Sequence, residues 1–255
     1  MLKALGGASP TIARPLGVSR RNPPRLISRV WLYGPTDGGS TPSRTVNQVA
    51  PAGAGWVDAR GIGAGGGRDS SGSNSGGGAA YARSGVSLNP GAVVVCTVAG
   101  QASTGADGVA STASAGGKTF MQAAGGKKGT AGGYGAGAAA GKGATAAHGA
   151  GGLSTDCIGT TIRAGGAGDA TYGGLPGSDA ADADSLGIGG QRRRPTSDLR
   201  VNDGSAAPIL TDYGAGGSGY AGDVPASPPT TGWGGDGRAG GPGIVVLEFW
   251  SKKPT

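Results

Sequence analysis

Few residues in this chain are suited to acid–base or nucleophilic chemistry. The 255 residues include a single histidine, His148, and a single glutamate, Glu248. His148 lies among alanines and glycines, and such a segment holds a side chain too loosely for a catalytic triad. General acid–base catalysis therefore has few candidate groups. We predict that the protein is not an enzyme and that it carries no catalytic residue and no cofactor.

The two cysteines, Cys96 and Cys157, do not lie in a metal-binding or redox spacing. Cys96 stands inside the apolar run 92–98, so we expect it to be a small buried residue. A disulfide between Cys96 and Cys157 requires their Cα atoms to approach within about 7 Å. The sequence leaves that pairing open.

Two glycine-containing motifs are similar to ligand-binding sequences. Residues 61–66 read Gly-Ile-Gly-Ala-Gly-Gly, which fits the dinucleotide-binding pattern. That pattern needs a helix directly after it, and residues 68–73 do not favour one. Residues 165–169 nearly match a calcium-binding nonapeptide, but their aspartate comes one position early. In a chain with 59 glycines such matches arise by chance, so neither motif predicts a bound ligand.

A group of aspartates in the second half of the chain is a candidate calcium site. Asp179, Asp182 and Asp184 are followed by Gly187. Their spacing is not that of an EF-hand loop, and no glutamate follows at the required position. We therefore expect these aspartates to lie in a solvated loop without a metal ion.

Aromatic and arginine side chains are scattered through the glycine-rich second half of the chain. Rings flanked by glycine suit stacking on a glycan or contact with a protein, and they equally suit packing beneath the loops. An arginine cluster suits phosphate groups or an acidic neighbouring subunit, although Asp198 and Asp203 are close enough in sequence to neutralise it. The candidate surface-binding residues are Tyr134, Tyr172, Tyr220, Trp233, Arg192, Arg193 and Arg194.

The first part of the chain is basic. Residues 1–36 contain six Lys or Arg residues and no acidic residue, while the net charge of the whole chain is +7. Four prolines within residues 1–29 favour an extended segment without a core of its own. We expect this arm to anchor the protein in an acidic groove of a partner, and we disfavour nucleic acid. The candidate anchoring residues are Arg14, Arg20, Arg21, Arg25 and Arg29.

The composition predicts an all-β protein. Glycine is abundant, and the helix-forming residues Leu, Glu, Gln and Met are scarce. We expect a small β-sandwich-like core with long glycine-rich loops. Those loops are either flexible or built from packed polyproline-II-like runs, which glycine allows because it has no Cβ. No apolar run approaches about 18 residues, so we expect no membrane insertion.

Strands are expected mainly within residues 30–98 and 243–250 of one domain, 30–255. The dense apolar strand near the end must be buried, so we expect it to return and pair with the start of the domain. A glycine-rich insert at about 100–241 holds weaker candidates. The first set of expected strands is 30–33, 44–49, 56–62, 79–88 and 92–98, and the insert offers 118–122, 160–163, 199–201 and 208–213.

The order of these parts resembles the glycine-rich domain of bacteriophage tail fibres and other phage virion proteins. The resemblance covers residues 44–250. The motifs that carry it are Pro51-Ala52-Gly53, Gly61-Ile62-Gly63-Ala64-Gly65-Gly66-Gly67 after Trp56, Gly76 to Arg83 with Val86 to Gly91, and Gly241 to Phe249. This chain departs from the pattern in an aromatic-poor strand at 57–62 and in an alanine-rich middle. Residues 1–29 match no part of the pattern.

The resemblance implies a virion structural protein. From the basic, proline-containing arm itself we expect residues 1–29 to anchor it to other virion proteins. The resemblance also implies a homo-oligomer, specifically a homotrimer, with glycine-rich loops that meet a host-surface glycan or protein. We expect a tail-fibre or tail-associated host-recognition component located on the tail or capsid surface of the virion. A capsid decoration or head-fibre protein is the alternative.

Two other classes of function compete with this reading. A nucleic-acid-binding structural protein would use the basic arm, and its binding would weaken steeply with salt. A polysaccharide depolymerase would need paired carboxylates beside a cleft, and no pair of aspartates in the sequence stands out for that role.

Overall fold

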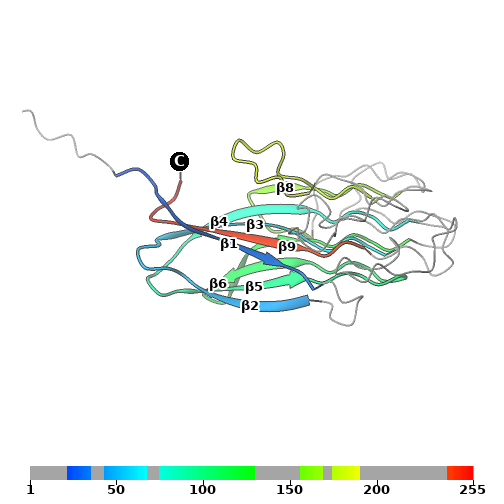
Figure 1. Cartoon of the computed structure of the whole chain (residues 1–255), viewed down its shortest axis with the longest axis horizontal. Coiled ribbons are helices and arrows are strands. Elements are labelled where there is room, and N and C mark those ends of the chain that lie inside the picture. Colours follow the sequence, from blue (N-terminus) through cyan, green and yellow to red (C-terminus); the bar gives the residue numbers. More distant parts are fainter. Residues whose placement is uncertain are drawn as a thin grey trace, which may run out of the picture.

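The structure, a computed structural model, describes residues 22–35, 43–67, 75–129, 156–168, 174–189 and 240–254. Within these ranges the chain forms two antiparallel sheets and no helix, which confirms the expected all-β, sandwich-like fold (Figure 1). In sheet A the strand order is β1 (Leu26–Tyr33), β9 (Ile244–Trp250), β3 (Trp56–Ile62), β4 (Tyr81–Ser87) and β8 (Thr161–Arg163). In sheet B the order is β2 (Ser43–Val49), β5 (Val93–Ala99), β6 (Ser111–Ala115) and β7 (Lys118–Ala123).

The last strand, β9, lies inside sheet A rather than at its edge. It pairs with β1 on one side and with β3 on the other, so that Leu247 lies opposite both Val30 and Ala59. Every residue of β9 except Trp250 is buried. The expectation that this strand returns to the start of the domain is therefore confirmed.

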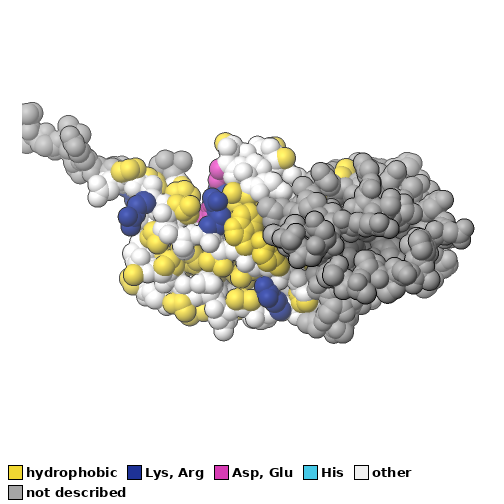
Figure 2. All heavy atoms as spheres, viewed as in Figure 1, with side chains coloured by type: hydrophobic (Ala, Val, Ile, Leu, Met, Phe, Trp, Pro, Cys, Tyr) yellow, Lys and Arg dark blue, Asp and Glu magenta, His cyan; other side chains and the backbone are white. Residues whose placement is uncertain are grey.

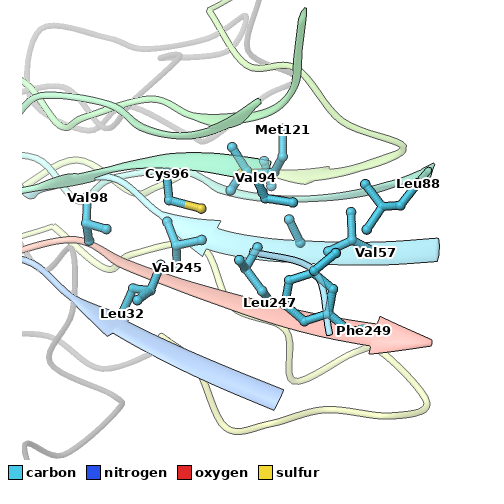
Figure 3. Close-up of a cluster of buried hydrophobic side chains, with 14 of the residues drawn as sticks. Leu32, Val57, Leu88, Val94, Cys96, Val98, Met121, Val245, Leu247 and Phe249 are labelled. Atoms are coloured by element: carbon cyan, nitrogen blue, oxygen red, sulfur yellow. The ribbon is translucent and has the colours of Figure 1, made fainter. Parts of the chain in front are cut away.

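The core fills the space between the two sheets (Figure 3). In β3, Val57 and Ala59 point into this core, whereas Asp58 and Arg60 point to the outer face of sheet A, as their alternation in the sequence indicates. Cys96 is buried in the core, and burial raises the pKa of its thiol to about 12. The large side chains in this core belong to Leu32, Val57, Leu88, Val94, Cys96, Val98, Met121, Val245, Leu247 and Phe249.

The question of a disulfide is settled by the structure. Cys96 and Cys157 are both free. Cys157 packs instead against a small separate cluster formed by Ala80 and Ala124.

Glycine-rich segments prolong the strands at one end of the sandwich, and we call them the glycine bundle. Neighbouring segments are joined by backbone hydrogen bonds although none of them is a strand. Four successive N–H groups donate to three different neighbours, at 2.9 Å each: Ala64 to Val109, Gly65 to Gly241, Gly66 to Gly77 and Gly67 to Ala106. The segments of the bundle are 63–67, 75–80, 100–109, 124–129, 164–168, 174–178 and 240–243.

The bonds in the bundle repeat every three residues. Ala64 and Gly67 are three residues apart and bind the same neighbouring segment. The N–H groups of Gly77 and Ala80 likewise both donate to segment 124–129. Three residues per turn is the period of the polyproline II helix, whereas a β-strand repeats every two. The hydrogen-bond spacing within the glycine bundle is therefore that of packed polyproline-II-like runs, whereas other described parts of the insert form β6, β7, β8 and the loop at 178–189.

The close spacing of the bundle excludes side chains at specific positions. A Cβ built on Gly66 would overlap the carbonyl of Lys127, and one on Gly240 would overlap the carbonyl of Gly65. Gly166 differs, because the nearest atom to its Cβ would be 3.6 Å away, an ordinary van der Waals distance. Glycine is thus required at most, but not all, contact points of the bundle.

We predict that Gly66→Ala destabilises the protein by roughly 2 kcal/mol or more, because the added methyl group meets rigid backbone. Gly166→Ala is the matched control, and its effect is expected to be neutral or slightly stabilising. Urea unfolding of both variants measures the difference. Equal losses of stability in the two variants would contradict the packed bundle.

Several strand boundaries differ from the sequence-based expectation. The expected strand at 30–33 begins at Leu26, so the first four residues of sheet A fall inside the expected arm. Strand β6 was not expected, because its sequence Ser-Thr-Ala-Ser-Ala lacks large apolar residues. The candidates at 118–122 and 160–163 correspond to β7 and β8. The candidates at 199–201 and 208–213 lie outside the described residues.

The body has two distinct ends (Figure 1). At one, the arm end, residues 22–25 approach the sheet and residues 251–254 leave it. The turns at 50–55, 88–92 and 116–117 close this same end. The glycine bundle forms the other end, the bundle end. None of the described residues belongs to a helix long and apolar enough to cross a membrane.

Candidate functional site

The outer face of sheet A carries a row of arginines. Arg60 in β3 lies directly opposite Arg83 in β4. Like charges in directly opposed positions destabilise a sheet unless they are neutralised. Arg60 is also completely buried, which makes an unpaired charge there costly. This pair of strands therefore needs carboxylates from elsewhere.

Some of those carboxylates come from sheet A itself. Glu248 in β9 accepts hydrogen bonds from Arg60 Nη2 at 3.0 Å and from Arg29 Nε at 2.8 Å. Asp58 in β3 accepts from Arg83 Nη2 at 2.6 Å. Glu248 is the only glutamate of the chain, and it is 1% exposed.

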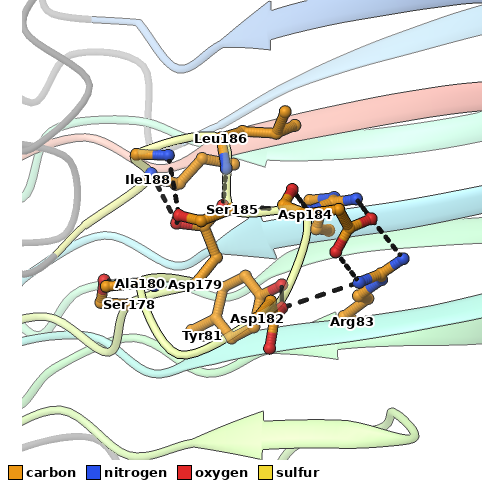
Figure 4. A network of polar contacts seen from close by, with 12 residues as sticks. Tyr81, Arg83, Ser178, Asp179, Ala180, Asp182, Asp184, Ser185, Leu186 and Ile188 are labelled. Carbon is orange, nitrogen blue, oxygen red and sulfur yellow. Dashed lines mark hydrogen bonds and ion pairs between the residues drawn. The ribbon is translucent and has the colours of Figure 1, made fainter.

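The other carboxylates come from residues 178–189, the aspartate loop, which lies across β3 and β4 (Figure 4). Asp184 Oδ2 lies 2.7 Å from Arg60 Nη2, and Asp184 Oδ1 lies 2.7 Å from Arg83 Nη1. Asp182 accepts from Arg163 Nη2 at 2.7 Å and from the hydroxyl of Tyr81 at 2.9 Å. The aspartate loop is thereby fastened to three strands of sheet A.

Asp179 holds the loop in shape. It is fully buried, and its carboxylate accepts from the N–H of Leu186 at 2.6 Å, the N–H of Ile188 at 2.9 Å and the hydroxyl of Ser185 at 3.0 Å. These bonds direct the side chain of Ile188 inward, where it packs with Tyr81 and Ile62 in a second apolar cluster. The loop is therefore fixed by packing as well as by charge.

The network nearly balances its own charge, with four guanidinium groups and five carboxylates. Its guanidinium groups belong to Arg29, Arg60, Arg83 and Arg163, and its carboxylates to Asp58, Asp179, Asp182, Asp184 and Glu248. Burial alone would raise the pKa of Asp184, but Arg83 and Arg60 outweigh it and lower that pKa to about 2. Burial raises the pKa of Asp58, and the contact with Arg83 offsets this only in part. Carboxylates engaged in this way are poorly placed to exchange protons with a substrate.

The expectation of a solvated aspartate loop was wrong for Asp179, which is fully buried, and for Asp182, whose side chain is 9% exposed. It holds for Asp184, whose side chain is 51% exposed. Asp182 and Asp184 bind arginines 19 and 124 positions away in sequence, so no local pattern indicates these contacts. Among the described residues, no group of metal-ligating side chains converges on a shared point.

The dinucleotide-like motif at 61–66 passes from β3 into the glycine bundle. No helix follows it within the described residues. The N–H groups of Gly65 and Gly66 already donate to backbone carbonyls. These N–H groups are therefore not available to cradle a phosphate.

Two of the candidate anchoring residues lie within the described ranges. Arg25 is exposed at the arm end, and its N–H donates to Ser251 Oγ at 3.0 Å. Arg29 is part of β1, and Glu248 binds its guanidinium, so its charge is largely satisfied inside the domain. Arg14, Arg20 and Arg21 lie outside the described residues.

The candidate surface-binding residues also lie outside the described ranges, but the residues that flank them are described. Gly168 and Gly174 flank the stretch that contains Tyr172. Gly189 and Gly240 flank the longer stretch that holds most of the candidates. All four flanking glycines lie in or beside the glycine bundle. The candidates outside the described residues are Tyr134, Tyr172, Tyr220, Trp233, Arg192, Arg193 and Arg194.

A small pocket of about 70 Å³ lies beside segment 100–109 of the bundle. Gln101 lines it and is 2% exposed, and its side-chain oxygen has no hydrogen-bond partner. Asp107 also lines it, but its carboxylate is bound by the N–H of Lys128 and by Lys127 Nζ. A pocket of this volume holds water molecules rather than a sugar ring.

The comparisons with known proteins add no family to these observations. No protein-family model matches the chain, and no curated protein is significantly similar to it.

We predict that Arg60→Met destabilises the protein by about 3–5 kcal/mol, because it removes the arginine beside the buried Asp179 and one of the two arginines that bind the buried Glu248. Arg44→Met, at an exposed arginine of β2, is the control and should change stability by less than about 0.5 kcal/mol. Chemical denaturation checks both values. A loss below about 1 kcal/mol for Arg60→Met, the cost of an ordinary substitution, would contradict the network.

A second prediction concerns acid sensitivity. The pKa of Asp184 is lower in the folded protein than its ordinary value of 3.8, so its stabilisation is complete above about pH 4 and is lost as the pH falls towards 2. Asp184→Asn should therefore show a smaller drop in thermal midpoint between about pH 4 and 2 than the unmodified protein. The pKa of Asp58 is shifted in the opposite direction, but Asp58 is present in both proteins, so its contribution cancels in the comparison. An equal drop in thermal midpoint in both proteins over this pH range would refute the stabilising role of ionised Asp184.

Proposed function

We propose that this chain is a bacteriophage virion structural protein, a tail-fibre or tail-associated component that contacts the host and is anchored by its N-terminal arm. One observation carries the proposal. The basic arm joins one end of the body, and the glycine-rich excursions with the candidate binding residues start from the opposite end. A host-contact protein needs this separation between attachment and display.

The glycine bundle supports the display role. Its segments are joined laterally by backbone hydrogen bonds, which makes the bundle a stiff support without a large hydrophobic core. Binding residues on loops act best when a rigid scaffold positions them. The aspartate loop adds a second fixed point, since it secures the chain just before Gly189, where the longest excursion begins.

The resemblance to glycine-rich domains of phage virion proteins supports the same assignment, and with it a homotrimer. The motifs that carry the resemblance lie at the Pro51 turn, at the junction of β3 with the glycine bundle and in β9. The depolymerase alternative gains no support, because five of the described carboxylates are bound by arginines.

We predict that deletion of residues 1–21 leaves a folded body that no longer joins phage particles. The deletion must stop before Leu26, because removal of residues 1–29 would take away half of β1 and Arg29. Circular dichroism and thermal melting test the fold, and co-sedimentation with particles tests incorporation. Normal incorporation of the truncated protein would refute the anchoring role of the arm.

Electron microscopy of particles labelled with an antibody to this chain locates the protein. Label on the tail or its fibres supports the host-contact role. Label over the head assigns the chain as a capsid decoration or head-fibre protein. Absence from purified particles refutes the virion assignment.

A further inference from the structure

The two ends of the described chain are joined at the arm end of the body. The N–H of Arg25 donates to Ser251 Oγ at 3.0 Å, and the N–H of Ser251 donates to the carbonyl of Arg25 at 2.9 Å. One position further on, Leu26 lies opposite Trp250 in the sheet. The residues that lead out of the arm and the residues that follow β9 thus form one continuous surface.

The charged side chains that the described residues place on this surface are all positive, and Figure 2 shows a Lys/Arg patch at the arm end of the face in view. Arg25, Lys252 and Lys253 are exposed at the ends of sheet A, and Lys118 is exposed beside the β6–β7 turn at the same end of sheet B. The described carboxylates lie elsewhere. Five belong to the arginine network, Asp107 lies against Lys127 in the bundle, and Asp156 is next to Gln122, near the bundle end of β7.

The tail after β9 is held in place rather than projecting freely. Lys253 Nζ lies over the ring of Trp56, 5.4 Å from its centroid, in a cation–π contact. Gly85 leaves room for that ring, since a Cβ there would be 2.7 Å from it. The side chain of Leu26, 37% exposed, adds an apolar contact site next to the cations.

We propose that residues 22–26 and 251–254, together with Lys118, form a single docking surface for an acidic protein surface on the virion. This inference rests on the proposed function and extends it, because it makes the end of the chain part of the anchor. A protein partner fits better than nucleic acid. The cations are few and spread over both sheets, with Leu26 and a proline pair among them, whereas duplex binding uses a denser set of phosphate contacts.

The charge reversal Lys252→Glu/Lys253→Glu tests the docking surface in the full-length protein. The matched control is Lys127→Glu/Lys128→Glu, which reverses two adjacent lysines in the glycine bundle. Each variant is mixed with phage particles assembled without this chain, and binding is measured by co-sedimentation at low and high salt. We expect the Lys252→Glu/Lys253→Glu variant to bind the particles about tenfold or more weakly than the unmodified protein does. The control should bind as the unmodified protein does.

The outcomes separate this inference from the proposed function. Failure of the unmodified protein to bind the particles refutes the proposed function. If the unmodified protein binds and the Lys252→Glu/Lys253→Glu variant binds equally well, the docking surface is refuted and the proposed function is not. Lys252→Gln/Lys253→Gln guards against misfolding, since it removes the charges without adding carboxylates and should also weaken binding. A 20-base-pair DNA duplex, used as a second probe, overturns the protein partner if it binds at physiological salt and competes with the particles.

Discussion

The backbones of the glycine bundle lie so close together that a Cβ does not fit between most of them. This closeness lets the central segments 63–67 and 75–80 exchange hydrogen bonds with more than two neighbours, which the strands of a sheet cannot do. Ordering so many glycines costs much conformational entropy. The lateral hydrogen bonds offset that cost without a large apolar core, and the sandwich at the base holds the segments in register through the strands that enter them.

Ion pairs on the outer face of sheet A provide a second restraint, in addition to the hydrogen bonds of the bundle. The inner face of sheet A packs on sheet B, while its outer face carries arginines that need partners from the aspartate loop. The aspartate loop continues the chain from bundle segment 174–178 and lies over Arg60 of β3 and Arg83 of β4. Backbone hydrogen bonds and buried ion pairs therefore fix consecutive parts of the same glycine-rich stretch. The hydrogen bonds act between main chains, and the ion pairs attach the stretch to the sheet.

The sequence was enough to predict the fold class, most strands and the return of β9. Those features depend on apolar runs and turn residues that are local in the chain, such as Ile244–Trp250. Strand β6 escaped prediction because serine, threonine and alanine give no apolar alternation. The local sequence pattern could not decide between flexible loops and a packed bundle either. Both have the same composition, and they differ only in which distant segments lie beside them.

The candidate site was predicted less well than the fold. Asp179, Asp182 and Asp184 drew attention as a group, but their role depends on Arg60, Arg83 and Arg163, which face them only in the folded sheet. The alternation of Asp58 and Arg60 in β3 was the available signal, because two opposite charges on one strand face require a cover if that face is buried. Glu248 carried a similar signal, as a lone carboxylate in an otherwise apolar strand.

The position of β9 also decides when this protein can fold during its synthesis. Among the described strands, β1 pairs only with β9, and β3 needs β9 on one of its edges. A ribosome that has made residues 26–33 must add more than two hundred further residues before that partner exists. Until then the nascent chain exposes two unpaired strand edges, which are prone to associate with other chains. Sheet A therefore cannot be completed before residues 244–250 have been made, and a chain that stops before residue 244 lacks the strand that lies between β1 and β3.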